Sequence, residues 1–544
     1  MIISAQTAPQ SRHPIPRRWW HDAVFYQIYP RSFRDSNGDG IGDLDGVTTM
    51  LDYLNDGTAD SLGIDAIWLC PIHPSPHRDW GYDISDYCAI DPDLGDLKSF
   101  DRLIAEAHRR HIRVILDLVP NHTSDRHPWF RRSRGSRRNS KRRWYIWAPG
   151  KGNGPPNNWV SAFAGPAWTY DPFTDEWYMH SFLPEQPDLN YRRAEVAEAM
   201  HGVMRFWLER GADGFRVDAV SRLSKDAELR DNPAASDRAG ASRSDAGGVR
   251  VNFYCHDQPE VHQLLRGFRR VLNGYGDRMM VGEVWPREQP LLAQYLRPDE
   301  LNLAFNFRFF KSPYSAGAFG AAVRDNDELC AAGAWPTWTL SNHDFMRHIS
   351  RYESDNATEG RARVAAMMLM TLRGTPFIYY GEEIGMRQVD IPPARRRDPM
   401  GRDGCRTPMQ WSSALQGGFT ASPAGPWLPC GDYLRTNVAA QARDGRSLLA
   451  LYRRLIRLRR ETPTLREGVY RSFDGIPQDC LAFYREGAGR RLLVMLNFAH
   501  EPRQTESPAG TLLLSTEPDR LPQSLDARLV LGADEGVVID LGAA

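Results

Sequence analysis

Short, almost continuously apolar runs alternate with segments of helical periodicity along most of the chain. Eight such runs stand out, at residues 24–30, 66–71, 114–120, 214–220, 279–285, 302–310, 338–344 and 375–381. None shows the apolar–polar alternation of a strand with one solvent face, so we expect strands that are buried on both faces. Between them, segments such as 99–111 and 195–210 repeat apolar residues at helical spacing.

Eight strand–helix units predict an α/β fold, a (β/α)8 TIM barrel, although a doubly wound sheet has the same local rhythm. Residues 123–187, rich in Pro, Asn, Gly and Trp, interrupt the spacing after the third strand and predict an inserted subdomain. After a helical segment at 448–461, short strand-like runs predict a C-terminal antiparallel β-domain. The predicted domains are the barrel (1–122 and 188–466), the inserted subdomain (123–187) and a C-terminal β-sandwich (467–544).

Composition and charge narrow the class of function. The 544-residue chain carries 68 basic and 68 acidic side chains, a balance that is not typical of a protein that binds nucleic acid through bulk positive charge. No apolar run approaches the ~18 residues of a membrane-spanning helix. The N-terminal residues lack a signal-peptide pattern, and the seven cysteines show no CxxC pair. We therefore expect a cytoplasmic protein with reduced thiols and no nucleic-acid or membrane partner.

Two polar segments have simple interpretations. The basic run at 131–144 is interpreted as a solvated face of the inserted subdomain rather than a nucleic-acid site. The stretch at 231–250 is small and polar, and is interpreted as a mobile loop.

Acidic residues stand at the predicted carboxyl ends of several strands, where barrel enzymes hold their active sites. Asp218 ends the fourth strand, Glu283 the fifth and Asp344 the seventh. A single acid in such a place is more often a helix cap or a salt-bridge partner. Three acids from different strands, pointing into one mouth, predict a catalytic centre.

Four segments match, in order, four sequence regions of the α-amylase family of glycoside hydrolases. They are DLVPNHTS (117–124), GFRVDAV (214–220), GEVW (282–285) and SNHD (341–344). QPDLN (186–190) resembles a fifth region of the oligo-1,6-glucosidase and α-glucosidase branch. The resemblance covers nearly the whole chain and implies a barrel, an inserted subdomain and a C-terminal β-domain.

The resemblance also implies roles for the acids. Glycoside cleavage passes through an oxocarbenium-like state, and retaining enzymes place two carboxyl groups ~5–5.5 Å apart around it. Asp218 is then the nucleophile, Glu283 the acid/base, and Asp344 a ligand of the sugar hydroxyls that favours the transition state. Arg216 would keep Asp218 ionised and oriented. Further implied substrate contacts are His122 and His343, which donate to hydroxyls, and Phe163, an aromatic platform under the sugar.

A second set of implied contacts closes the end of the sugar pocket. Asp79 and Tyr82 match a family segment that holds the terminal glucose, and RDGCRTPMQW (402–411) resembles a segment whose second arginine pairs with that acid. We therefore expect Arg406 to pair with Asp79, with Arg402 nearby; a plain surface salt bridge is the alternative. A closed pocket predicts exo action on short substrates.

The residue after the nucleophile, Ala219, bears on linkage. Branch members that prefer α-1,6 bonds tend to carry Val there, so the smaller residue favours α-1,4 bonds. A methyl-scale contact is worth only ~1–3 kcal/mol and biases linkage without deciding it.

DSNGDGIGD (35–43) predicts a structural Ca²⁺ site, because it places hard oxygen donors close together in a loop that can curl. The resemblance implies ligands from Asp35, Asn37, Asp39, the Ile41 carbonyl and Asp43. A metal-free turn rich in Asp and Asn is the alternative. No organic cofactor and no catalytic metal are expected.

Together these observations predict a retaining, exo-acting α-glucosidase that hydrolyses terminal α-1,4-linked glucose from short α-glucosides such as maltose or sucrose, with transglucosylation. The alternatives are a trehalose- or isomaltulose-forming transferase or isomerase of the same family, and a non-catalytic sugar-binding relative. The three acids disfavour the latter. We expect a monomer or a homodimer.

Overall fold

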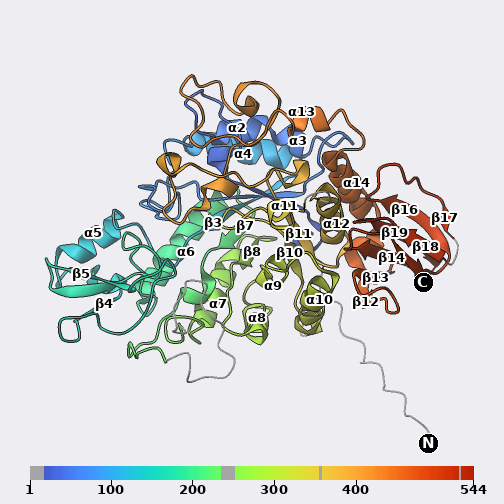
Figure 1. Ribbon diagram of the computed structural model, residues 1–544. Helices are drawn as coiled ribbons and strands as arrows, with labels where there is room; N and C mark the ends of the chain where they lie inside the picture. The colour runs from blue at the N-terminus through green and yellow to red at the C-terminus, as the bar shows by residue number, and fades with distance from the viewer. Residues whose placement is uncertain (1–16, 234–251, 332, 355–357, 526–527, 544) are drawn as a thin grey trace, which may run out of the picture.

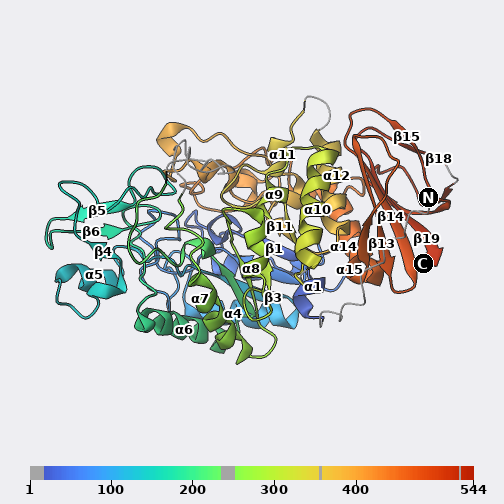
Figure 2. The same cartoon turned by 90° about the horizontal axis from the view of Figure 1, so that it is seen from below.

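The computed structural model describes residues 17–233, 252–331, 333–354, 358–525 and 528–543. Most of the predicted polar loop, residues 234–250, lies outside the described residues. In both views the inserted subdomain lies at one end of the barrel and the C-terminal β-domain at the other (Figure 1, Figure 2).

Eight parallel strands form the central sheet, which confirms the predicted barrel. Their order is β10-β11-β1-β2-β3-β7-β8-β9, so sequential strands are neighbours and, among the described strands, only the β9–β10 seam lacks a ladder. A doubly wound sheet would instead reverse its order part-way. The strands are β1 (Phe25–Ile28), β2 (Ala66–Leu69), β3 (Arg113–Leu118), β7 (Gly214–Val217), β8 (Met279–Gly282), β9 (Leu303–Ala304), β10 (Thr337–Thr339) and β11 (Thr375–Tyr379).

The sixth strand is much shorter than the sequence pattern predicts. Only Leu303–Ala304 pair as β9, and Phe307–Phe310 form helix α9. The side chain of Asn306 accepts a hydrogen bond from the Phe309 amide at 3.0 Å and caps this helix. The prediction of a strand over 302–310 is therefore wrong beyond Ala304, because the cap begins a helix inside the apolar run.

Helices cover the outside of the barrel, as the helix α4 illustrates. Asp96 caps α4 by accepting from the Ser99 amide at 2.8 Å, and the helix buries Phe100, Leu103 and Ile104. No helix in the described part of the chain has both the length and the apolar character needed to cross a bilayer. The longer helices are α4 (Leu97–Arg109), α6 (Ala194–Glu209), α7 (Val261–Asn273), α10 (Ala316–Ala331), α12 (Thr358–Thr371) and α14 (Leu448–Glu461). Shorter ones are α1 (Trp19–Asp22), α2 (Leu44–Thr49), α3 (Leu51–Leu54), α8 (Leu292–Tyr295), α11 (His348–Arg351), α13 (Val438–Gln441) and α15 (Pro463–Glu467).

The inserted subdomain carries a small antiparallel sheet of order β4-β6-β5. Two isolated β-bridges connect the subdomain to the chain that re-enters the barrel. His122, where the subdomain begins, pairs with Asp188, and Tyr145 in its interior pairs with Leu189. Most of the basic run at 131–144 is exposed, as expected, but Arg142 is 5% exposed and pairs with Glu176. The elements are α5 (Pro128–Gly135), β4 (Trp147–Ala148), β5 (Trp168–Asp171) and β6 (Glu176–Met179).

The C-terminal domain is antiparallel, as predicted. One sheet has the order β12-β13-β14-β19-β16-β17, and β15 pairs with β18. The strands are β12 (Val469–Ser472), β13 (Cys480–Gly487), β14 (Arg490–Asn497), β15 (Arg503–Glu506), β16 (Gly510–Ser515), β17 (Ser524–Leu525), β18 (Arg528–Leu531) and β19 (Gly536–Ala543).

The pairing of β7 with β8 predicts a position that tolerates only glycine. Gly214 has φ +154°, and a Cβ there would lie 2.0 Å from the Met279 carbonyl oxygen of β8. We expect Gly214→Ala to lower the free energy of unfolding by ~1–3 kcal/mol, measured by denaturant titration.

Gly202→Ala is the matched control, because a Cβ at this position in α6 meets nothing within 4 Å. It should leave stability unchanged or raise it by ~0.5–1 kcal/mol. Equal stability of the two variants would contradict the assigned clash.

Candidate active site

The ends of β7 and β8 bring two acids together. Val217 pairs with Gly282 in the parallel ladder, so the next residues, Asp218 and Glu283, leave the sheet side by side. The Glu283 amide donates to the Val217 carbonyl at 2.9 Å, and the Val220 amide donates to the Glu283 carbonyl at 3.1 Å. The register of two neighbouring strands thus places both carboxyl groups at one edge of the barrel.

A single buried arginine holds these acids. Arg216 Nη1 donates to Asp218 Oδ1 at 2.7 Å and to Asp117 Oδ1 at 2.8 Å, and its Nη2 donates to Glu283 Oε2 at 2.7 Å. Arg216 is 1% exposed. Its predicted contact with Asp218 is present, while its contacts with Asp117 and Glu283 were not predicted from the sequence. Asp218 and Glu283 occupy the two terminal nitrogens of one guanidinium, so their carboxyl groups face a common region.

The Asp218 carboxyl group titrates under opposing influences. Burial raises the pKa of Asp218 well above its usual value, Arg216 opposes this rise, and the Glu283 carboxylate adds to it. Burial also raises the pKa of Asp117, to about 6, against the lowering effect of Arg216. Two close carboxyl groups share protons as a pair. The ionised form of Asp218 therefore depends on its contact with Arg216.

Asp344 lies in a different electrostatic setting. Its Oδ1 accepts from Arg402 Nη1 at 3.1 Å and Arg406 Nη2 at 3.2 Å, and its Oδ2 lies 3.2 Å from His343 Nε2. Burial opposes ionisation of Asp344, yet the charges of Arg402 and Arg406 hold its pKa below the usual range. Its side chain is 22% exposed. Asp344 is therefore an ionised acceptor that a sugar hydroxyl can reach.

Tyr82 connects His343 to the acids on Arg216. The Tyr82 hydroxyl donates to Asp117 Oδ2 at 3.0 Å and lies 2.6 Å from His343 Nε2, while His343 Nδ1 lies 2.8 Å from the amide nitrogen of Gln27. Gln27 can only donate through that nitrogen, so His343 carries its proton on Nε2. Burial lowers the pKa of His343 to about 3, which keeps the ring neutral.

Arg402, not Arg406, pairs with Asp79, so this prediction from the sequence is wrong. Arg402 Nη2 contacts Asp79 Oδ1, and Asp398 holds the same guanidinium through Nε at 3.0 Å. The 3₁₀ turn η8 (Arg402–Cys405) separates the two arginines. Beyond this turn Arg406 is fully buried, and its Nε donates to the His343 carbonyl at 2.8 Å. This bond directs the Arg406 guanidinium toward the His343 backbone rather than toward Asp79.

Gln186 is a site residue that the sequence analysis missed. Its Nε2 donates to Asp79 Oδ2 at 2.8 Å and lies 3.0 Å from His122 Nε2. The signal was available, because Gln186 opens the QPDLN segment. Phe163 lies beside the same group, with its ring 5.4 Å from the guanidinium carbon of Arg402. The predicted residues Asp79, His122, Phe163 and Arg402 are therefore brought together.

Two further supports were also missed. Trp285 Nε1 donates to Glu283 Oε1 at 2.8 Å, so both oxygens of this acid are held. Lys225 Nζ lies 2.6 Å from Asp188 Oδ2 and donates to Asn121 Oδ1 at 2.7 Å, and all three side chains are buried. This ion pair links the two ends of the inserted subdomain to the barrel.

The loop at 35–43 presents oxygens that suit a hard cation. Asp35 Oδ1 accepts the amides of Asn37 at 3.0 Å and Gly38 at 2.7 Å, and Asp39 Oδ1 accepts that of Ile41 at 2.8 Å. A carboxylate oxygen has two acceptor positions, so the two amides fill Asp35 Oδ1, whereas Asp39 Oδ1 keeps one position for a metal. The other Asp35 oxygen accepts the Gly40 amide at 2.9 Å and the Thr420 hydroxyl, so a cation would have to displace protein donors to bind Asp35. The donor set, all oxygen, fits Ca²⁺.

Comparison with known proteins agrees with the site. The alpha amylase catalytic domain model matches residues 27–468. The chain belongs to the alpha-amylase family of glycoside hydrolases. A probable alpha-glucosidase of Rhizobium meliloti (strain 1021) is 42% identical over 516 residues, covering 91% of this chain and 92% of that protein. An oligo-1,6-glucosidase of Parageobacillus thermoglucosidasius is 38% identical over 531 residues, covering 89% and 91%. The solved structure of an alpha-glucosyl transfer enzyme has a TM-score of 0.89 at 39% identity, covering 96% of this chain and 99% of its own.

The shared titration of this glycoside hydrolase's acid pair predicts a pH signature. The wild-type kcat/KM should follow a bell, because the pair must hold one proton. Glu283→Gln removes the neighbour that raises the pKa of Asp218, so the acid limb should move to lower pH. The alkaline limb should disappear, because the pair then has no acid proton to lose.

The profile is best measured on a nitrophenyl α-glucoside, whose good leaving group reduces the need for protonation. Trp285→Phe is the matched control, since it removes a hydrogen bond to Glu283 but keeps both carboxyl groups. It should retain both limbs. An unchanged profile for Glu283→Gln would contradict the coupling.

Proposed function

We propose that the protein is a retaining, exo-acting α-glucosidase that removes terminal non-reducing glucose from short α-glucosides such as maltose or sucrose. The observation that carries this proposal is the placement of Asp218 and Glu283 on the two terminal nitrogens of Arg216. Two carboxyl groups that share one guanidinium suit the short separation of a retaining pair.

The proposed reaction uses these groups in two displacements. The Asp218 carboxylate attacks the anomeric carbon while Glu283 gives its proton to the leaving glycosidic oxygen, which forms a glycosyl–enzyme ester. Glu283, now ionised, takes a proton from water, and the resulting attack on the anomeric carbon releases glucose and restores Asp218. Asp344, ionised beside Arg402 and Arg406, would accept hydrogen bonds from the ring hydroxyls.

The Asp79–Arg402 pair supports exo action. Arg402 also contacts Asp344 and Asp398, and it lies by Phe163, so this end of the site is occupied by protein side chains. A glucose bound between Asp79 and Asp344 would have no path for a further sugar beyond it. Terminal glucose is then the unit removed.

The residue after the nucleophile supports a preference for α-1,4 bonds. Ala219 follows Asp218 with φ +47°, and its amide lies 3.3 Å from Glu283 Oε2. Its side chain is a single methyl group, which leaves room for the aglycone sugar next to the acid/base.

Glucosyl transfer is the second candidate, favoured by the high TM-score to the alpha-glucosyl transfer enzyme. The same glycosyl–enzyme ester reacts with a sugar hydroxyl in place of water, so both outcomes use the same acids. A trehalose- or isomaltulose-forming activity would be a special case of this transfer.

A product-resolved panel tests the function. Maltose, isomaltose, sucrose, trehalose, maltotriose and a nitrophenyl α-glucoside are incubated with the enzyme, and products are followed by NMR. We expect α-glucose as the first product, faster release from maltose than from isomaltose, and free glucose in excess over rearranged disaccharide. Rearranged disaccharide in excess would establish the transferase alternative, and β-glucose as first product would contradict retention.

Asp218→Asn should reduce kcat by several orders of magnitude and leave the melting temperature near that of the wild type. Asp101→Asn, an exposed acid on α4, is the control and should keep full activity. A loss of about tenfold or less in Asp218→Asn would contradict the role of nucleophile.

We also propose a structural Ca²⁺ held by Asp35, Asn37, Asp39, the Ile41 carbonyl and Asp43. Chelation should lower the melting temperature, because a metal that binds the folded state stabilises it, and should leave the initial rate at 25 °C nearly unchanged. Asp39→Asn should show the lower melting temperature without responding to chelator. Immediate and complete loss of activity on chelation would contradict a purely structural role.

A cytoplasmic location is proposed on the basis of the cysteines: Cys70, Cys88, Cys255, Cys405, Cys430 and Cys480 are free in the structure. A monomer or homodimer stays a prediction.

A further inference from the structure

Gln27 is a buried polar side chain of strand β1 that bonds a histidine of the site. It is 2% exposed, and the ladders of β1 place it beside Trp68 of β2 and Tyr379 of β11. Its Nε2 lies 2.8 Å from His343 Nδ1 and 3.3 Å from Cys70 Sγ. His343 lies on the loop after β10, which ends at residue 339, so this contact joins two distant parts of the chain.

The opposite nitrogen of the His343 ring faces two oxygen atoms. Nε2 lies 2.6 Å from the Tyr82 hydroxyl oxygen and 3.2 Å from Asp344 Oδ2. Tyr82 donates its own hydrogen to Asp117 Oδ2 at 3.0 Å, so its oxygen is free to accept. The ionised Asp344 carboxylate only accepts. Two acceptors at Nε2 require a hydrogen on that nitrogen.

The direction of the Tyr82 hydrogen is set by Asp117. Arg216 Nη1 donates to Asp117 Oδ1 at 2.8 Å, and Trp68 Nε1 donates to Asp117 Oδ2 at 3.2 Å. A carboxylate held by two such donors accepts and returns no hydrogen, so the Tyr82 hydroxyl points toward it. The Tyr82 oxygen is thereby left to accept from His343.

Gln27 supplies the donor that this arrangement needs at Nδ1. A neutral imidazole carries one hydrogen, so the hydrogen on Nε2 leaves Nδ1 as a bare acceptor. The Gln27 amide donates to Nδ1, and the donation continues from His343 to Tyr82. The other tautomer would set the Nε2 lone pair against the Asp344 carboxylate and would turn the Tyr82 hydrogen away from Asp117.

We propose that Gln27 is a positioning residue for catalysis, because it fixes the tautomer of His343 in which Nε2 carries the hydrogen. Through that hydrogen His343 orients the Tyr82 hydroxyl and the Asp344 carboxylate, two groups that we expect to contact the terminal glucose. The effect on catalysis rests on the proposed α-glucosidase function, whereas the tautomer is a property of the free enzyme.

NMR of protein labelled at the histidine ring nitrogens tests the tautomer directly, and His343→Asn identifies the signals of this ring by their loss. In the wild type at neutral pH we expect a hydrogen on Nε2 and none on Nδ1. Gln27→Glu places a carboxylate at Nδ1, and because an ionised carboxylate only accepts, Nδ1 should gain a hydrogen. A hydrogen on Nδ1 in the wild type would overturn the proposal, whatever substrate the enzyme cleaves.

The pH dependence of kcat/KM for Gln27→Glu and Gln27→Met tests the consequence for catalysis. Methionine is of similar length but cannot donate, so Gln27→Met should lose about tenfold in kcat/KM at every pH. In Gln27→Glu one added proton, on the new carboxyl group or on the ring, restores the hydrogen at Nε2 of His343. Its kcat/KM relative to the wild type should therefore rise by about tenfold from about pH 8 to about pH 5.

The charged and titratable groups that face His343 keep their charge across this range. The carboxylate has a lowered pKa, the guanidinium groups have a raised pKa, and all stay ionised: Asp344, Arg216, Arg402 and Arg406. Burial raises the pKa of each phenol and thiol, so all stay neutral: Tyr29, Tyr82, Cys70 and Cys405. Asp117, with a pKa raised by burial to about 6, is present in every protein compared, so its titration cancels in the ratio.

A direct effect of the added charge would have the opposite sign. A new buried carboxylate raises the pKa of Asp218 and Glu283 and moves both limbs of the profile to higher pH, which lowers the relative kcat/KM at low pH. A ratio for Gln27→Glu that is flat, or that falls as the pH falls, would overturn the proposal. Full activity of Gln27→Met would overturn it as well.

Gln410→Glu is the matched control, because Gln410 is also 2% exposed but its Nε2 bonds the Thr436 carbonyl. This variant introduces the same buried carboxyl group without changing the partner of His343. Its kcat/KM relative to the wild type should not depend on pH, measured below the melting temperature of each variant. The same rise at low pH in Gln410→Glu as in Gln27→Glu would show a general effect of a buried carboxyl group and would overturn the proposal.

Discussion

The site is organised around one buried cation, the guanidinium of Arg216. A fully buried arginine is costly unless its charge is compensated and its donors are bonded. Asp117 from β3, Asp218 from β7 and Glu283 from β8 supply that compensation. Because these three strands are consecutive in the sheet, their mutual register and the position of the guanidinium constrain one another. The need to compensate the charge of Arg216 therefore also sets the position of Asp218 relative to Glu283.

The surrounding electrostatics separate the acids by role. Asp218 and Glu283 share one arginine, so burial and the neighbouring carboxylate raise the pKa of Asp218. Asp344 contacts two arginines and stays ionised. The carboxyl groups of Asp218 and Glu283 are therefore suited to proton transfer, whereas that of Asp344 is suited to accepting hydrogen bonds from hydroxyls. The difference comes from the ratio of cations to carboxylates around each acid.

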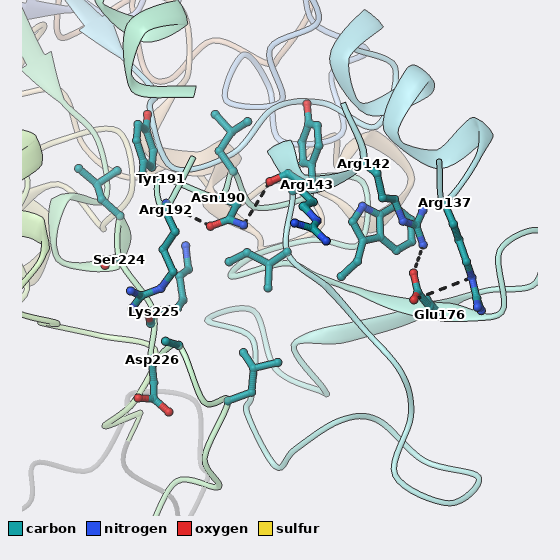
Figure 3. Close-up of a pocket in the computed structure, with 17 residues that line it drawn as sticks. Arg137, Arg142, Arg143, Glu176, Asn190, Tyr191, Arg192, Ser224, Lys225 and Asp226 are labelled. Atoms are coloured by element: carbon teal, nitrogen blue, oxygen red, sulfur yellow. Dashed lines mark hydrogen bonds and ion pairs between the residues drawn. The ribbon is translucent and has the colours of Figure 1, made fainter. Parts of the chain in front are cut away.

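The inserted subdomain completes the site and creates a second cleft. Asp188 and Asn121, at its two ends, both bind Lys225 of the barrel, and Gln186 next to them reaches Asp79 and His122. On the other side of this junction, Arg143 and Arg142 face barrel residues across the pocket of Figure 3. The contacts that hold the subdomain on the barrel therefore lie between the catalytic residues and the second pocket.

Local sequence patterns predicted the barrel and the antiparallel C-terminal domain, and the observed strand order then excluded a doubly wound sheet. Continuous apolar runs indicate burial on both faces, and the residue that directly follows a buried parallel strand emerges at its carboxyl edge, so the placement of Asp218 and Glu283 could be predicted from local pattern. The prediction that Asp344 ends a strand over 338–344 is wrong, because β10 stops at Thr339 and Asp344 lies on the loop beyond it. Which arginine pairs with Asp79 could not be predicted locally, because Arg402 and Arg406 are separated by the turn η8 and the path of that turn places Arg402 against Asp79 and Arg406 against the His343 carbonyl. The tertiary structure also ended β9 after Ala304, where the Asn306 cap begins a helix within an apolar run. Likewise it joined Arg216 to Asp117 and Glu283, since those contacts depend on strand neighbours that lie far apart in the chain and carry no local signal.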